Sequence, residues 1–335
     1  MTRLRTVSPD MPGWRRRRHG RGFVYLDSDG SPLCRGDKER CVALVIPPAW
    51  IGVWICPAEN GHLQAVGTDE AGRRQYLYHP DWRIRRDREK FEHMCEFAAK
   101  LPSARRRVSR DLGGHDLTYE RAAATAFRLF DLGVFRLGSE RYVEENGSYG
   151  LVTLERRHVR KSRDGITFGY VAKSGLPRSL VVRDKAVLRA IDDMRVRRSS
   201  SGQRLLAYKS GNRWSDLTSE AVNAYIKDVI DEDASAKDFR TWHANVLAAA
   251  ILATQQDLDT TSARNRAITE TMRRVADYLG NTAAVARSAY VDSRLIDLYQ
   301  DGTTIERALA HRTMPESGVA LRPSLELAVL DLLNA

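Results

Sequence analysis

The hydrophobic pattern of this chain changes once along its length, near residue 88, and this change constrains the fold more than any other feature. Before it, short runs of branched and aromatic residues alternate with turn dipeptides, which is typical of β-strands. After it, apolar residues recur at helical spacing, beginning with Phe91, Met94 and Phe97. We therefore expect an α+β protein with a β-rich domain over residues 1–88 and a larger, mainly α-helical domain over residues 89–335. A length of 335 residues agrees with two domains of roughly 150 residues each.

The local patterns predict the individual elements. Strands are expected in the first part at residues 21–26, 41–46, 53–56, 63–67 and 75–78, followed by a charged linker or helix start at 82–90. Helical spacing begins at Phe91, and further helices are expected at 122–130, 219–232, 239–255 and 264–279, the last closed by Gly280, and around 325–333. A small β-meander interrupts them, with strands near 151–154, 158–160, 166–171 and 179–182 and turns at Asp164-Gly165 and Ser174-Gly175.

The charge of the chain favours a polyanionic partner. Lys and Arg number 54 against 43 Asp and Glu, a net charge of +11, and nucleic acid is the commonest partner of such a chain. With 42% hydrophobic residues the chain is not a disordered tail. The basic run 15–18 is expected to be a flexible arm that adds salt-sensitive attraction.

The cysteines and the apolar runs indicate a cellular compartment. Cys34, Cys41, Cys56 and Cys95 form no C-x-x-C pair, so we expect buried free thiols, a reducing compartment and no metal site. The longest apolar run, 246–253, is far too short to span a membrane, and no apolar stretch of a secretion signal follows the basic N-terminus. A cytoplasmic protein is therefore expected, associated with the nucleoid if nucleic acid is its partner.

The common cofactor motifs are missing from the sequence. It contains no G-x-x-x-x-G-K-[ST] loop, no G-x-G-x-x-G loop, no H-E-x-x-H and no carboxylate cluster spaced for Mg²⁺. An enzyme of this sequence is expected to need no cofactor, neither ATP nor metal, and to act through cations and a nucleophile of its own.

A set of short strings carries a more specific signal. They are VFRLGSERY at 134–142, YVAKS at 170–174, KDFRTW at 237–242 and LGNTAAVARSAYV at 279–291, preceded by IPPAW at 46–50 and GRRQYLYHPDW at 72–82. Together, and in this order, the strings resemble the type IB DNA topoisomerases, in particular the short bacterial form similar to the poxvirus topoisomerase. The resemblance covers nearly the whole chain and implies the catalytic fold shared by these enzymes and the tyrosine recombinases.

The resemblance implies a set of catalytic residues. Tyr290 is similar to the family's nucleophile, and the residues that activate the scissile phosphate correspond to Arg136, Lys173, Arg240 and Asn281, with Lys237 as a possible assisting residue. The implied reaction is attack on one DNA strand to give a 3′-phosphotyrosyl intermediate, strand rotation, and religation. Supercoils of either sign would be relaxed without ATP, because the phosphotyrosyl link conserves the bond energy.

The residue types suit this chemistry. Two guanidiniums can clamp the non-bridging oxygens of a phosphodiester, and a lysine at a hairpin turn could give a proton to the leaving 5′ oxygen. A phenol with a pKa of about 10 needs help as a nucleophile, and the sequence identifies no general base for it. Asn281 departs from the histidine of many family members, and an amide cannot carry a positive charge. Tyr278 is expected in the core, and His158 and His243 are interpreted as structural or DNA-facing.

The strand expected at 75–78 has two interpretations. It is either an edge strand with a solvated cationic rim or a DNA contact surface, and its similarity to the family's DNA-contacting strand favours the second. The residues of this predicted surface are Arg73, Arg74, Gln75, Tyr76 and Tyr78, with both tyrosines on one face.

Two other functional classes stay open from the sequence. Tyrosine recombinases share the Arg, Lys, Arg, Tyr constellation, but they usually carry His where this chain has Lys237 and begin with a helical domain. A non-catalytic DNA-binding protein could retain the fold, yet the matched positions other than Asn281 carry the usual residues. The favoured hypothesis is a monomer that clamps double-stranded DNA.

Overall fold

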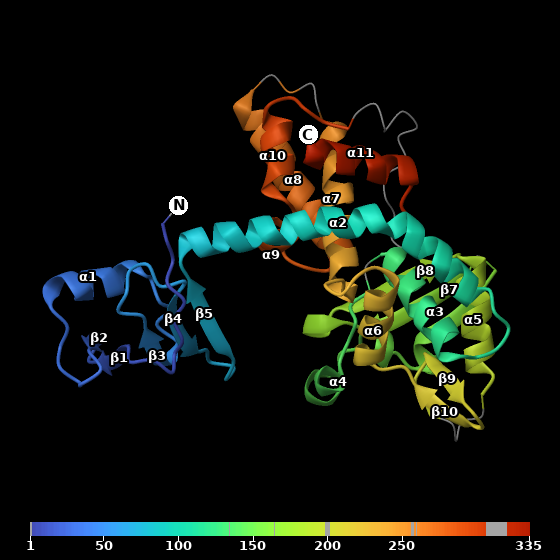
Figure 1. Cartoon of the computed structure of the whole chain (residues 1–335), viewed down its shortest axis with the longest axis horizontal. Helices are drawn as coiled ribbons and strands as arrows, with labels where there is room; N and C mark the ends of the chain where they lie inside the picture. Colours follow the sequence, from blue (N-terminus) through green and yellow to red (C-terminus); the bar gives the residue numbers. More distant parts are fainter. Residues whose placement is uncertain are drawn as a thin grey trace. The chain divides into compact units, whose positions relative to one another are not determined.

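The computed structural model describes residues 2–133, 135–163, 165–197, 202–255, 258, 260–305 and 320–335. The chain divides into two compact units, Met1–Glu92 and His93–Ala335. Both this division and the boundary expected after residue 88 fall within one long helix, α2 (Pro80–Leu112) (Figure 1). The charged stretch 82–90 is therefore the start of a helix, which was one of its two predicted interpretations, and not a linker.

An antiparallel sheet with one helix forms the first unit. Its strands are β1 (Trp14–His19), β2 (Gly22–Leu26), β3 (Ile51–Ile55), β4 (Leu63–Thr68) and β5 (Arg74–Tyr78), in the order β2-β1-β3-β4-β5. The helix α1 (Arg35–Ala43) contributes Cys41 to a core that also contains Tyr25, Val53, Ile55 and Ala65. The sheet places β5 at one edge, which leaves a row of main-chain groups and side chains open on that side.

The strand predicted at 41–46 is wrong. Residues 41–43 end α1, and the chain then turns through Val45, whose φ is +49°. Cys41 and Ile46 are buried, but Val42 and Val45 are 57% and 81% exposed. The apolar run resembles a strand in composition, but the preceding charged residues 35–40 form helical turns and carry Cys41 into the core from the helix.

The basic run 15–18 is part of β1 and not a flexible arm. Arg16 donates to the carbonyls of Ile46, Pro47 and Trp50 at 2.7–2.9 Å, and its guanidinium lies 4.2 Å from the centre of the Phe23 ring. Long arginine stems cover apolar surface while their charged ends stay near solvent, which allows so basic a strand. Arg16 also fixes the segment that contains IPPAW.

Helices make up most of the second unit. They are α3 (Tyr119–Asp131), α4 (Glu140–Asn146), α5 (Lys185–Arg195), α6 (Ser219–Val229), α7 (Ala236–Ala253), α8 (Thr261–Leu279), α9 (Ala283–Ala289), α10 (Ser293–Gln300) and α11 (Pro323–Asn334). The strands β6 (Val159–Ser162), β7 (Gly165–Val171) and β8 (Pro177–Val182) form one antiparallel sheet, and β9 (Ala207–Ser210) and β10 (Arg213–Asp216) form a hairpin. The α+β class is confirmed.

The central helix of the second unit is α7. Nearly all of its residues are buried, and it packs against α3, α6, α8, α10 and α11. The Phe239 ring meets Phe97 and Phe127 edge-to-face at centroid distances of 5.0 and 4.9 Å. A helix that is apolar on all sides belongs in the interior, so the polar residues on α7 are held rigidly.

The meander differs in part from its prediction. The strands at β6, β7 and β8 are confirmed, and Lys173–Gly175 form a short 3₁₀ turn between β7 and β8. Residues Leu151–Thr153 are a 3₁₀ turn and not a strand, because Thr153 bonds back to Gly150. The β9–β10 hairpin was not predicted. Asp164 of one predicted turn lies outside the described residues.

The four cysteines are free thiols, and most of them are buried. Cys41, Cys56 and Cys95 are buried as expected, but Cys34 is exposed, because it precedes α1 at the surface.

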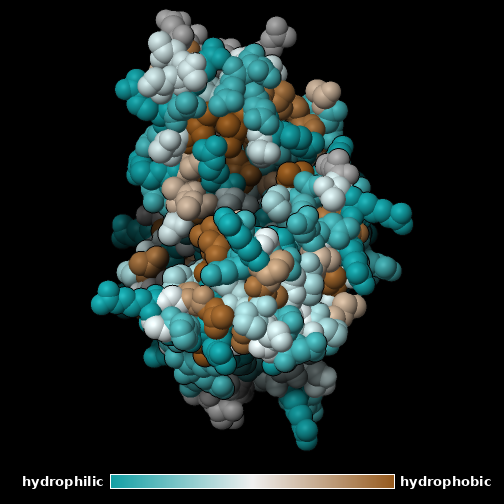
Figure 2. All heavy atoms as spheres, turned by 90° about the vertical axis from the view of Figure 1, so that its left-hand side faces the viewer, coloured by the Kyte–Doolittle hydropathy of each residue, from teal (hydrophilic) through white to brown (hydrophobic). Residues whose placement is uncertain are grey.

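On the face shown in Figure 2, hydrophilic side chains cover most of the surface and hydrophobic ones lie between them in separate patches. Within the described part of the chain, none of the helices has the length and apolar character that a membrane span requires.

Candidate active site

The C-terminal turn of α8 binds arginines from three other segments of the second unit through consecutive main-chain carbonyls. The hydrogen bonds run from Arg178 to Asp277 (3.5 Å) and Tyr278 (3.3 Å), from Arg240 to Leu279 (2.9 Å), and from Arg136 to Gly280 (3.1 Å). The carbonyl of Asp277 also accepts from the N–H of Gly280 at the closing turn, and together these carbonyls carry the negative end of the helix dipole. The end of α8 therefore collects guanidiniums without using a carboxylate for these bonds. We call these three arginines the carbonyl-held cluster.

Gly280 makes this arrangement possible. Its φ of +66° is left-handed, and the N–H groups of Gly280 and Asn281 bond back to Asp277 and Ala276 as in a Schellman motif. A Cβ at position 280 would lie 2.0 Å from Nη2 of Arg178. Glycine is thus required both for the turn and for the close approach of the guanidinium, and the chain leaves the helix at Asn281.

Arg136 orients the side chain of Asn281, and the amide nitrogen of that side chain has no partner among the described residues. Its Oδ1 accepts a hydrogen bond from Nη2 of Arg136 at 2.5 Å. Its Nδ2 is buried and has no hydrogen-bond partner among the described residues. A buried donor without an acceptor costs about 1–3 kcal/mol, so an oxygen of a bound anion would be a favourable partner.

Tyr290 lies at the end of α9 and is only 8% exposed. The guanidinium of Arg240 is 5.6 Å from the centre of its ring. Asn245 of α7, fully buried, donates from Nδ2 to the carbonyl of Tyr290 and accepts at Oδ1 from the N–H of Asp292, both at 2.8 Å. Asn245 therefore fixes the main chain on both sides of Val291 and, with it, the base of the Tyr290 side chain.

The charges around Tyr290 favour its phenolate. Burial alone would raise the pKa of the Tyr290 hydroxyl, but the positive charges of Arg240, Arg136 and Lys237 outweigh burial and lower that pKa. Lys237 is exposed and precedes Arg240 by three residues on α7, about one helical turn. Burial and the neighbouring Arg136 lower the pKa of Arg240 to about 10, which leaves it charged at neutral pH.

Lys173 reaches the same region from the β7–β8 turn. It is exposed, and it lines a cavity of about 10 Å³ together with Arg136, Tyr170 and Arg178. The structure thus groups Arg136, Arg240, Asn281 and Tyr290 through direct contacts and charges. Of these four residues, Arg136 shares the small cavity with Lys173. Of the string that contains Arg136, Val134 and the side chain of Tyr142 lie outside the described residues.

Tyr278 has surroundings that differ from those of Tyr290. Its hydroxyl is 2.8 Å from Nδ1 of His243, and Nε2 of His243 lies 3.0 Å from the carbonyl oxygen of Asp131. Burial raises the pKa of Tyr278 and lowers that of His243 to about 4, so both are neutral at neutral pH. His243 is buried and Tyr278 is half-buried, so Tyr278 lies at the border of the core and not within it as expected.

In the first unit, the predicted DNA contact surface lies on β5 and the turn before it. The Tyr76 and Tyr78 rings stack on one face, with centroids 6.1 Å apart. Asp69 holds both Arg73 and Gln75 by hydrogen bonds of 2.9 and 2.8 Å. Arg74 is exposed. The strand at a sheet edge thus presents cations and aromatic rings, and its contact with DNA stays a prediction.

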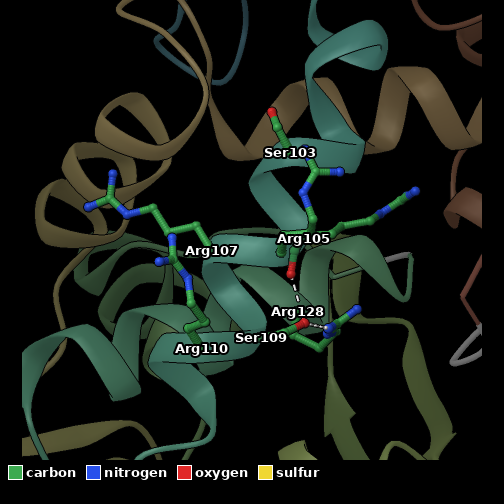
Figure 3. A pocket seen from close by; sticks show the side chains of 7 residues that line it. Ser103, Arg105, Arg107, Ser109, Arg110 and Arg128 are labelled. Atoms are coloured by element: carbon green, nitrogen blue, oxygen red, sulfur yellow. Dashed lines mark hydrogen bonds between the residues drawn. The ribbon is translucent and has the colours of Figure 1, made fainter.

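The second unit also has an arginine-lined groove of about 730 Å³, which we call the α2 groove. Its lining residues are Ser103, Arg105, Arg106, Arg107, Ser109, Arg110 and Arg128 (Figure 3). Arg105 binds both Asp131 and Glu326, Arg107 pairs with Asp228, and Arg128 donates to Ser109 at 2.8 Å. Carboxylates neutralise much of this charge, so the groove is a weaker candidate for an anion site.

Sequence reasoning missed Arg178 and Asn245. Arg178 follows Lys173 by five residues on the next strand, and Asn245 is a polar residue that directly precedes the apolar run 246–253. The second of these is a detectable signal, because a buried amide in an apolar helix needs partners.

Comparison with known proteins gives concordant matches. Residues 79–311 match the family described as eukaryotic DNA topoisomerase I, catalytic core, and residues 22–69 match bacterial DNA topoisomerase IB, N-terminal domain. The DNA topoisomerase 1B of Acanthamoeba polyphaga mimivirus is 29% identical over 300 residues, which cover 87% of this chain and 88% of the viral protein. The DNA topoisomerase 1B of vaccinia virus (strain Copenhagen) is 25% identical over 252 residues, 70% of this chain and 72% of that protein.

Proposed function

Because the chain belongs to the type IB DNA topoisomerases, we propose that it relaxes positive and negative supercoils through a 3′-phosphotyrosyl link to Tyr290. The observation that carries this proposal is the guanidinium of Arg240, 5.6 Å from the centre of the Tyr290 ring; with Arg136 and Lys237 it lowers the pKa of Tyr290 against the opposing effect of burial. Near the end of α8, the pKa of Tyr290 is lowered, whereas burial raises the pKa of Tyr278 and of Tyr170. A nucleophile needs the lowered pKa.

The cleavage step follows from the placement of these groups. The Tyr290 phenolate oxygen attacks phosphorus, and the bond from phosphorus to the 5′ oxygen breaks. Arg136 and Arg240 stabilise the charge on the non-bridging oxygens, and Nδ2 of Asn281 donates to one of them. Lys173 gives a proton to the departing 5′ oxygen, and Lys237 supports the phenolate. Religation reverses these steps, so the reaction needs neither ATP nor a metal.

The first unit supplies part of the DNA-binding surface in this proposal. In this proposal the side chains that contact the duplex are the ones that the sequence predicts, Arg73, Arg74, Gln75, Tyr76 and Tyr78. Arginines and tyrosines on a strand contact phosphates, and glutamine can bind a base edge in the major groove. The unit is then a DNA-binding domain, the helical unit is the catalytic domain, and the protein acts as a monomer around double-stranded DNA.

Plasmid relaxation tests the proposal directly. The wild-type protein is expected to relax positively and negatively supercoiled plasmids with EDTA present and no ATP, and to leave a covalent protein–DNA adduct when quenched with detergent. Tyr290→Phe is expected to bind DNA without relaxing it or forming the adduct. An active Tyr290→Phe variant, or an adduct on the 5′ end of the break, would contradict the assignment. Strand transfer between two duplexes would indicate a recombinase instead.

A further inference from the structure

Arg178 lies among the site residues although it belongs to none of the strings that resemble the family. It is on β8, directly opposite Tyr170 of β7 in the ladder, and it lines the small cavity with Arg136 and Lys173. The turn between β7 and β8 carries Lys173. One hairpin therefore delivers two cations to the end of α8.

The bonds of Arg178 leave much of its guanidinium for another partner. Its donors reach the carbonyls of Asp277 and Tyr278 at 3.5 and 3.3 Å. Bonds from a guanidinium to a fully charged acceptor are typically about 2.7–2.9 Å, and a guanidinium has five N–H donors. The carbonyls therefore orient Arg178 without neutralising it, in contrast to the carboxylates that hold Arg105.

The surroundings concentrate positive charge at this point. Burial lowers the pKa of Arg178 most, Tyr170 opposes this effect, and the positive charge of Arg136 lowers the pKa by a smaller amount than Tyr170 raises it. The charge of Arg178 also contributes to the lowered pKa of Arg240. Like charges held together in a partly desolvated site are unfavourable, and an anion between them would relieve that cost.

The cavity fits a small part of an anion. Its volume of about 10 Å³ is close to that of one water-sized sphere, so it admits a single oxygen rather than a whole small molecule. Gly280 forms one side of it, and the absence of a Cβ there leaves room for the Arg178 guanidinium. One oxygen held by cations on several sides is the environment that a phosphodiester oxygen requires.

We infer that Arg178 is a further catalytic residue, which binds a non-bridging oxygen of the phosphodiester attacked by Tyr290 together with Arg136. This inference rests on the proposed function. Arg178 then shares the negative charge that develops on that oxygen as the Tyr290–phosphorus bond forms and the bond to the 5′ oxygen breaks. Because Arg178 and Lys173 lie on the same hairpin, an Arg178 side chain that binds the phosphate also positions Lys173.

The test separates the charge of Arg178 from its hydrogen bonds. Arg178→Gln keeps an amide donor for the α8 carbonyls without the charge, Arg178→Lys keeps the charge, and Arg178→Ala removes both. The matched control is Arg183→Ala, an exposed arginine just beyond β8. Covalent adduct formation on supercoiled plasmid is measured in a single turnover at saturating enzyme. Duplex binding is measured for the same changes in a Tyr290→Phe background, and folding by thermal unfolding.

We expect Arg178→Ala and Arg178→Gln to slow adduct formation about 10²-fold, with Arg178→Lys in between and Arg183→Ala near wild type. Binding should fall much less than the rate. An Arg178→Gln variant as fast as Arg178→Lys, or a loss confined to binding, overturns the inference. If Arg178→Ala does not fold, the Gln and Lys pair decides. Failure of the wild type to form any adduct refutes the proposed function itself, whereas a fast Arg178→Gln beside an active wild type refutes only the role of Arg178.

Discussion

The second unit gathers arginines in two places, and the groups that hold them differ. In the α2 groove, Arg105 lies 2.6 Å from carboxylate oxygens of both Asp131 and Glu326. In the carbonyl-held cluster, Arg240 and Arg136 donate to the uncharged carbonyls at the end of α8. A guanidinium held by a carboxylate has its charge cancelled, whereas one held by a carbonyl keeps its charge for a ligand. Both clusters consist of arginines, so the difference between them comes from the groups that the arginines bind.

The pKa values of Arg105 and Arg240 reflect this difference in their partners. Burial alone would lower the pKa of Arg105, but the carboxylates of Asp131 and Glu326 outweigh it and raise that pKa. For Arg240 burial acts in the same direction, and Arg136 adds to it, so the pKa falls to about 10. The end of a helix carries only about half an elementary charge, too little to neutralise the cluster.

The largest expected effect is on catalysis by the carbonyl-held cluster. Arg240→Ala should slow adduct formation about 10³-fold at saturating DNA, because a preformed cation is lost from the site where charge develops. Its effect on the midpoint of urea unfolding should be small, since a crowded positive charge is removed with it. Single-turnover adduct formation and urea unfolding measure the two quantities.

The matched change in the α2 groove is Arg106→Ala, which removes an exposed arginine of that lining. Its rate should stay within about twofold of wild type, because a charge outside the site contributes little to the transition state. If Arg106→Ala slowed cleavage as much as Arg240→Ala, the distinction between the two clusters would be wrong.

In the α2 groove the large effect should be on stability. Arg105→Ala leaves Asp131 and Glu326 buried without their shared cation, and breaking a buried ion pair typically costs about 3–5 kcal/mol. Glu326 also accepts a hydrogen bond from Trp242 of α7 at 2.7 Å, so removing Arg105 also disturbs a contact with the central helix. Urea unfolding should show a free energy of unfolding lowered by about 3 kcal/mol. An unchanged unfolding midpoint would refute a structural role.

The sequence predicted the helical part of the fold better than the sheet. Helices α3, α7 and α8 bury apolar residues at helical spacing or on all sides, which local patterns reveal. The strand β1 contains four successive arginines, and its position depends on bonds from Arg16 to the distant segment 46–50, so no local pattern indicates it. The opposite holds for residues 41–46. They have the composition of a strand, but 41–43 end α1, so the local pattern predicted the wrong element.

The same limit applies to the site. The strings similar to the family contain Arg136, Arg240 and Tyr290, and the structure brings these residues together. The positions of Arg178 and Asn245 depend on bonds to main-chain carbonyls 99 and 45 residues away along the chain. Contacts over such separations follow from the packing of α7, α8 and β8, which the spacing of residues does not specify.

A smaller effect is expected at Asn281, the residue that departs from the family's usual histidine. Asn281→Ala removes the buried Nδ2 donor and the acceptor that orients Arg136. A hydrogen bond to a charged group contributes about 1.5–3 kcal/mol, so adduct formation should slow about 10- to 100-fold, less than for Arg240→Ala. Plasmid relaxation and adduct rates measure the loss. A rate equal to wild type would mean that Nδ2 does not contact the phosphate.

The smallest expected effect is a shift in pH dependence at Lys237. The rate of adduct formation should rise with pH as the Tyr290 phenol ionises, with a midpoint below 10 because the pKa is lowered. Lys237→Ala removes one of the positive charges that lower it, so the midpoint should move to higher pH, by less than about one unit for an exposed cation. The rate near neutral pH should then fall a few-fold and approach wild type at high pH. Lys227→Ala, an exposed lysine on the neighbouring helix α6, is the control and should leave the midpoint in place. A midpoint that moves downward, or equally in both variants, would show that Lys237 does not act on the phenol.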